Sequence, residues 1–130
     1  MKKFFSSIIA SLCVLLMASC GANTPSSVAE DYLDNIKDGK YLDAIELMKF
    51  KKEPTQQDKE QLAQMFSDKI DKTVDKYGEF ENYEIVGEEI SEDGQFATVY
   101  YKMNYANKKN IDDKVKLILV DGQWKVNSGK

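Results

Sequence analysis

The hydrophobic pattern of this chain changes its period once, at Gly78, and this change limits the folds that the chain can adopt. Before Gly78, apolar residues recur every three to four positions, which is the spacing of one face of an amphipathic helix. After Gly78, apolar and polar residues alternate, which is the spacing of a half-buried strand. The sequence therefore predicts an α+β fold, in which helices pack on one face of an antiparallel sheet.

Three N-terminal helices are predicted before this change of period. The first begins at Ser26 and is stopped by Gly39, which suits the left-handed position that follows many helices. The second covers residues 41–48. Thr55 is a suitable N-cap for the third helix, and Asp58, three residues later, gives a variant of the capping box. We expect these three helices to form the layer that covers the sheet.

About four strands are predicted after the helices, and they cover residues 80–91, 97–105, 115–120 and 124–126. Asp121-Gly122 is a strong signal for a type I′ turn between the last two strands. Strand alternation divides the apolar residues between two faces. The face toward the helices carries Val99, Tyr101, Val115 and Leu117. The outer face then carries Tyr100, Ile118 and Val120, which could form a small docking patch.

Residues 1–19 have the features of a secretory signal peptide. Two lysines precede an uncharged segment, residues 4–17, and its 14 residues are too few for a transmembrane helix, which needs about 20. Met17-Ala18-Ser19-Cys20 follows, and it resembles the lipobox of bacterial lipoproteins, with Met17 at a position that usually carries Leu.

The lipobox resemblance implies that Cys20 receives a diacylglyceryl group and becomes the mature N-terminus, with a further acyl chain such as palmitate on its amine. Two or more chains anchor a protein stably, whereas one chain does not. Residues 20–27 would be the lipidated cysteine and a short tether. We expect a location in the cell envelope, facing the periplasm, since no acidic residue directly follows Cys20. The alternative is an ordinary signal peptide in which Cys20 is incidental.

The composition excludes several functions for the remaining domain, residues 28–130. The chain has no His and no Arg, so it has neither a Ser-His-Asp triad nor a zinc site built on imidazole. Cys13 leaves with the signal peptide and Cys20 is consumed by lipid, which leaves no cysteine for a disulfide. The net charge is −4, and it becomes −6 without Lys2 and Lys3, which argues against nucleic acid as a partner. No metal site and no cofactor are predicted.

Several short motifs resemble those of a known group of proteins. Asp121-Gly122-Gln123-Trp124-Lys125-Val126 resembles the ending of many small secreted proteins of the nuclear-transport-factor-2-like superfamily. Ala97-Thr98-Val99 and Asp38-Gly39-Lys40-Tyr41 also fit. The most similar group is a lipoprotein family called domain of unknown function 4878. This resemblance implies a cone-shaped, cystatin-like fold, with a curved sheet around a helix and a pocket at one end.

Aromatic residues are the candidates for the lining of such a pocket, namely Tyr32, Tyr41, Tyr77, Tyr101, Tyr105 and Trp124. They could equally fill a closed core. The superfamily's enzymes use an Asp–His pair or Tyr and Asp, and the His is absent here. No nucleophile has a visible base, so we expect no enzyme. The sequence favours a non-catalytic binding module for a small apolar ligand. The alternative is an interaction protein that forms a homodimer or docks an envelope protein through Tyr100, Ile118 and Val120.

Overall fold

The computed structural model describes residues 23–107 and 109–129, so the predicted signal peptide and Cys20 lie outside the described residues. Apart from one strand of two residues between the second and third helices, helices come first along the chain and strands follow, as the change of period at Gly78 predicted. The elements are α1 (Pro25–Lys37), α2 (Tyr41–Glu46), β2 (Met48–Lys49), α3 (Gln56–Tyr77), β3 (Phe80–Ile90), β4 (Phe96–Tyr105), β5 (Asn110–Val120) and β6 (Gln123–Asn127).

The described strands form one sheet in the order β2-β6-β5-β4-β3, which confirms the α+β class but corrects the strand count from about four to five. The four long strands are antiparallel neighbours, and the extra strand, β2, runs parallel to β6. The sequence predicts Met48 at the end of the second helix, but α2 ends at Glu46 and Met48 pairs with Val126 of β6. The N–H of Val126 donates to Leu47 O at 2.8 Å, because the outer edge of β6 needs a hydrogen-bond partner. A strand of two residues has no period that a sequence could show.

Helix caps fix the two long helices. Thr24 caps α1, with Ser27 as the reciprocal partner, so α1 begins at Pro25 and takes in residues that the sequence had assigned to the tether. Pro25 is buried, so this segment belongs to the folded domain. Thr55 and Asp58 form the predicted capping box of α3, and Gly78 ends this helix with a φ of 86°.

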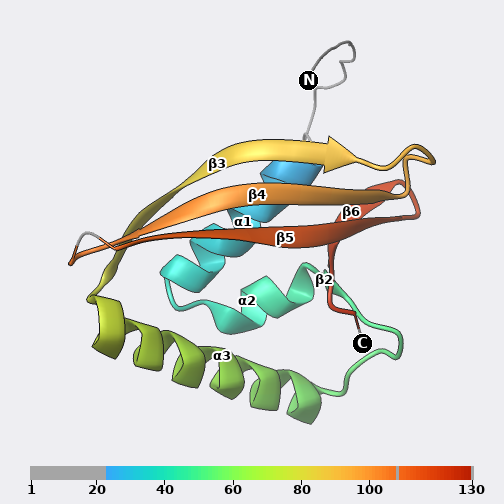
Figure 1. Ribbon diagram of the computed structural model, residues 1–130. Helices are drawn as coiled ribbons and strands as arrows, with labels where there is room; N and C mark the ends of the chain where they lie inside the picture. The colour runs from blue at the N-terminus through green and yellow to red at the C-terminus, as the bar shows by residue number, and fades with distance from the viewer. Residues whose placement is uncertain (1–22, 108, 130) are drawn as a thin grey trace.

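The core lies between α1 and the concave face of the sheet, which arches over α1 and α2 in Figure 1. Val28 and Leu33 of α1 pack with Val99, Leu117 and Val126 of the sheet. Irregularities in the pairing of β3 with β4 lie between Phe80 and Asn82 and between Ile85 and Gly87. Bulges of this kind increase bend and twist, so they favour the curvature of the sheet.

The helix α3 forms a separate layer below α1 and α2 (Figure 1), and none of its 22 residues is fully buried. Its N-terminal half is held to α2 by an ion pair of 2.8 Å between Lys59 and Glu46 and by an edge contact between Tyr41 and Phe66. The candidate site lies between its C-terminal half and the sheet, which its last residue, Tyr77, contacts at Tyr105. None of the helices in the described ranges is long and apolar enough to cross a membrane.

Candidate functional site

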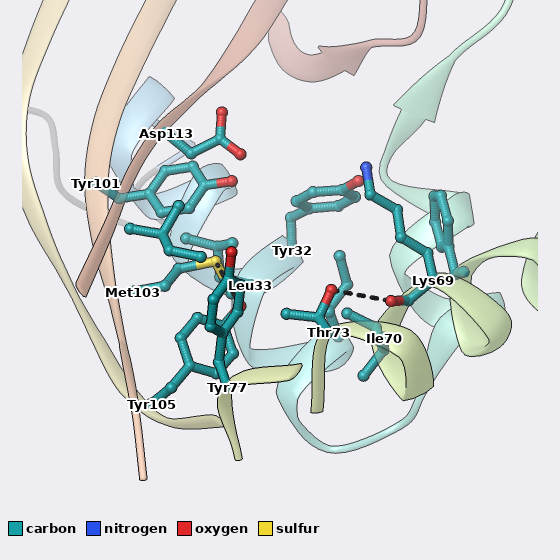
Figure 2. A pocket seen from close by; sticks show the side chains of 13 residues that line it. Tyr32, Leu33, Lys69, Ile70, Thr73, Tyr77, Tyr101, Met103, Tyr105 and Asp113 are labelled. Atoms are coloured by element: carbon teal, nitrogen blue, oxygen red, sulfur yellow. Dashed lines mark hydrogen bonds between the residues drawn. The ribbon is translucent and has the colours of Figure 1, made fainter. Parts of the chain in front are cut away.

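A cavity of about 300 Å³ lies between the C-terminal half of α3, the helix α1 and the strands β4 and β5 (Figure 2). This volume is at the lower end of the range for small-molecule sites. The cavity is lined by Tyr32, Leu33, Ile36, Phe66, Lys69, Ile70, Thr73, Tyr77, Tyr101, Met103, Tyr105, Ile111 and Asp113.

Local periodicity brings these side chains together. On β4, residues 101, 103 and 105 share the inner face of the strand, and on β5, residues 111 and 113 do. The strand register pairs Tyr101 with Asp113 and Met103 with Ile111. The lining residues of α3 recur three or four positions apart, which places them on one side of the helix.

The lower part of the cavity is apolar and its polar groups are mostly satisfied. The Tyr77 and Tyr105 rings lie 5.7 Å apart between centroids. The Tyr105 hydroxyl donates to Met103 Sδ at 3.7 Å, and the Thr73 hydroxyl donates to Lys69 O at 3.0 Å (Figure 2). This part therefore suits an apolar group.

The other end of the cavity is polar. In Figure 2, Tyr101 and Asp113 project from the sheet, and Lys69 projects from α3 on the opposite wall. Burial raises the pKa of Tyr101, and the nearby Asp113 carboxylate raises it further. The same two causes, in the same order, raise the pKa of Tyr32. Both hydroxyls therefore stay protonated at neutral pH and can donate hydrogen bonds.

Four of the six aromatic residues predicted from the sequence line this cavity: Tyr32, Tyr77, Tyr101 and Tyr105. Whether the cavity binds a ligand stays a prediction. Tyr41 does not line it, although its ring packs edge-on against the lining residue Phe66, at 6.4 Å between centroids. Trp124 also lies outside, half-buried on β6, where it pairs with Leu119 and its backbone N–H donates to Asn23.

Sequence reasoning missed Asp113 and Lys69 as lining residues. Alternation could have found Asp113, because it lies two residues before Val115 and therefore shares the inner face of the strand. Lys69 has no comparable signal. It lies beside Ile70 on a helix whose inner side is only half-buried, and a lysine there looks like part of a solvated face.

The family is decided by a comparison with protein-family models. The model described as "Domain of unknown function (DUF4878)" matches residues 18–127. The chain belongs to the DUF4878 family. Among the curated proteins, none matches this sequence.

One solved structure shows that this DUF4878 protein has an NTF2-like fold. A Campylobacter jejuni protein named for an NTF2-like transpeptidase is 15% identical, with a TM-score of 0.64, over 80% of this chain and 97% of that chain. An NTF2-like protein of unknown function from Silicibacter pomeroyi is 15% identical, with a TM-score of 0.45, over 78% of this chain and 85% of that chain. At these identities the likeness concerns the fold alone.

The outer face of the sheet in this DUF4878 protein divides the predicted docking residues into two groups. Tyr100 lies opposite Lys114, and its hydroxyl donates to Glu89 at 2.6 Å. Ile118 lies four residue pairs away, opposite Phe96, and the pair Thr98–Lys116 lies between them on the same face. The predicted single patch of Tyr100, Ile118 and Val120 is therefore wrong in its outline.

Phe96 was missed by the sequence reasoning, because it stands at the start of β4, beside the turn. Its side chain is 47% exposed. The apolar group on this face is therefore Phe96, Ile118 and Val120, which we call the outer patch. In residues 23–107 and 109–129, no cluster of acidic residues has the geometry of a metal site.

Proposed function

We propose that this DUF4878 protein is a membrane-anchored binding module, which holds a small and largely apolar ligand in the cavity without transforming it. The observation that carries the proposal is the cavity itself. A 22-residue helix, α3, has no fully buried residue, and its inner side faces a space of about 300 Å³ instead of a filled core. Apolar side chains that line an open space lose packing contacts, which a ligand of suitable shape would restore.

The chemistry of the lining supports binding over catalysis. The Thr73 hydroxyl is already committed to a backbone carbonyl of its own helix. The Tyr32 and Tyr101 hydroxyls have raised pKa values, so at neutral pH they are poor bases and poor nucleophiles. The side chains that line the described cavity therefore offer hydrogen-bond donors and apolar contacts. Asp113, the carboxylate beside Tyr32 and Tyr101, adds to burial in raising the pKa of both hydroxyls and so does not activate them as nucleophiles.

Anchoring is the second part of the proposal, and it rests on the sequence of residues 1–20. Pro25 is already folded into α1, so the tether between Cys20 and the domain is shorter than the sequence suggested. A lipid on Cys20 would then hold the cavity close to the membrane surface, within the cell envelope.

An apolar fluorescent probe tests the binding function. N-phenyl-1-naphthylamine, which is neutral, should bind residues 21–130 and gain fluorescence. Thr73→Trp fills the cavity from α3 and should abolish this gain. The matched control is Met65→Trp on the same helix, because Met65 is 59% exposed and does not line the cavity. Equal fluorescence for both variants, or no gain with the unmodified protein, would contradict the proposal.

A second candidate function is docking through the outer patch, either to a second copy of the chain or to another envelope protein. The exposed Phe96, directly opposite Ile118, favours it. Native mass spectrometry across a range of concentrations tests self-association. A dimer should be lost in Phe96→Lys and kept in Val86→Lys, a control residue that is 56% exposed elsewhere on the sheet. A monomer at every concentration would remove the homodimer.

A further inference from the structure

The cavity contains charged groups whose arrangement indicates the class of ligand, and the inference below rests on the proposed binding function. Asp113 supplies the only carboxylate among the lining residues. One of its oxygens accepts the backbone N–H of Lys114 at 2.8 Å. Among residues 23–107 and 109–129, the ion pair present is Lys59–Glu46, so Asp113 has no cationic partner within 4.0 Å there.

Aromatic rings surround the space that this carboxylate faces. Tyr101 is paired with Asp113 across the two strands. Tyr32 and Tyr105 also lie near Asp113: burial is the larger cause of the raised pKa of each hydroxyl, and the Asp113 charge raises that pKa further. Phe66 and Tyr77 line the wall on α3. The face of an aromatic ring attracts cations, and an amine among several rings beside a carboxylate receives both forms of attraction.

Lys69 on the opposite wall is the group that disfavours a cation. It is exposed, and a lysine has a flexible stem that can carry its ammonium group into solvent. The charge of the whole chain acts in the other direction, since 22 acidic residues exceed 18 basic ones. An excess of negative charge raises the local concentration of cations.

We propose that the cavity selects an amphiphilic amine, with an apolar body between α3 and the sheet and a positively charged head at Asp113. A carboxylate ligand of the same size would place its charge beside Asp113 and would be repelled. A neutral ligand would keep the apolar contacts but lose the charged hydrogen bond.

Three probes with one skeleton and different heads test this selection: 4-phenylbutylamine, 4-phenylbutanol and 4-phenylbutyrate. Isothermal titration calorimetry with residues 21–130 should give a dissociation constant about tenfold lower for the amine than for the alcohol, which corresponds to about 1.4 kcal/mol. The acid should bind most weakly. Methyl NMR locates the probe, since the Met103 signal should shift while the exposed Met65 signal should not.

Two asparagine variants separate the role of the Asp113 carboxylate from the effect of the net charge of the protein. Asp113→Asn should remove the preference for the amine over the alcohol. Asp112→Asn is the matched control, because Asp112 lies opposite Lys102 on the other face of the same strand and its loss changes the net charge equally. This control should keep the preference. Lys69→Met should not weaken binding of the amine.

Each alternative result has one meaning. Equal affinity for the amine and the alcohol would overturn the selection of an amine and leave the proposed binding function intact. Tighter binding of the acid, lost in Lys69→Met, would show that Lys69 holds the head and would also overturn it. If neither these probes nor N-phenyl-1-naphthylamine bind, the proposed function fails as well.

Discussion

The Tyr83 hydroxyl of β3 donates a hydrogen bond of 2.7 Å to Oδ1 of Asp34 in α1. The same hydroxyl lies 3.2 Å from Glu30 O, one helical turn earlier. β3 is one of the two edge strands of the sheet, and α1 is the helix that contributes most to the core. This contact therefore ties the edge of the sheet to α1, which carries one wall of the cavity.

Removing the Tyr83 hydroxyl should destabilise the protein. We expect Tyr83→Phe to lower the free energy of unfolding by about 1 kcal/mol, the usual net value of one hydrogen bond, because the site is partly exposed. Tyr100→Phe is the control, since it removes a similar bond to Glu89 on the open outer face and should cost less. Urea denaturation measures both. Equal costs would show that the Tyr83 bond has no special role.

The tyrosines also predict a loss of stability in alkali. Burial and then the Asp34 hydrogen bond raise the pKa of Tyr83, and burial and then Asp113 raise that of Tyr101. The unfolded chain releases these protons near pH 10, whereas the folded chain keeps them longer. Their contribution to stability is therefore complete below about pH 10 and declines as the pH rises above it.

Urea denaturation between pH 8 and pH 11 measures this decline. The double variant Tyr83→Phe/Tyr101→Phe keeps every lysine but lacks both hydroxyls, so its stability should fall less steeply above pH 10. An unchanged slope would assign the alkaline loss to the lysines and would contradict the prediction.

Leu33 predicts the cost of damage to the core. Its side chain is 2% exposed, and it contributes both to the core and to the cavity wall. Leu33→Ala should lower the free energy of unfolding by about 2–5 kcal/mol, as truncation of a buried leucine does. Leu42→Ala on α2, where the side chain is 42% exposed, should cost far less. Similar denaturation midpoints for the two variants would show that Leu33 is not a core residue.

Local signals in the sequence predicted the parts of the fold that depend on neighbouring residues. Asp121 and Gly122 have φ angles of 51° and 81°, as the predicted type I′ turn requires. The capping box at Thr55 was likewise correct. Such features are set within four residues of the chain, so composition and spacing are enough to find them.

Features that depend on distant segments were not predictable in the same way. β2 forms because it pairs with the edge of β6, and the partner of Met48, Val126, lies 78 residues later in the chain. The family resemblance implied a pocket at one end of the fold, but the sequence did not place it beside α3, since an amphipathic helix predicts burial of its apolar side but not how closely that side approaches the sheet. Four of the six predicted aromatic residues line the cavity, whereas Lys69, which also lines it, was not predicted.

Gly78 connects α3 to the sheet, and its conformation should be specific to glycine. Its φ is 86°, and an added Cβ would lie 3.2 Å from Ala106 Cβ and 3.3 Å from Asn107 N. Gly78→Ala should therefore cost about 1–3 kcal/mol, because a φ of 86° with a ψ of −176° is a backbone conformation nearly restricted to glycine, together with the cost of displacing this close contact. Gly39→Ala is the control, because Gly39 has a similar φ of 75° but nothing within 4 Å of its added Cβ.

Urea denaturation should show a larger loss of stability for Gly78→Ala than for Gly39→Ala, since Gly78 adds a steric contact and an extended ψ of −176° to the positive φ. Because Gly78 joins the end of α3 to β3, it sets the position of α3 relative to the sheet. Gly78→Ala should therefore also weaken binding of N-phenyl-1-naphthylamine, whereas Gly39→Ala should not. Equal stability of the two variants would mean that the loop at Ala106 yields easily and does not hold α3 in place.

Cys20 carries the last prediction, which concerns the membrane anchor. If Cys20 is lipidated, the protein expressed with its signal peptide should be found in the membrane fraction, because two or three acyl chains anchor it stably. Cys20→Ser removes the acceptor sulfur and should move the protein to the soluble fraction or leave it unprocessed. Ser19→Ala is the control, since a small residue before the cysteine is kept.

Mass spectrometry of the mature N-terminus should show the acyl groups on the unmodified protein and on the control. An unacylated N-terminus, with the same fractionation for Cys20→Ser as for the parent, would rule out the anchor. The cavity would then act in a protein that is secreted or held in the envelope by other means.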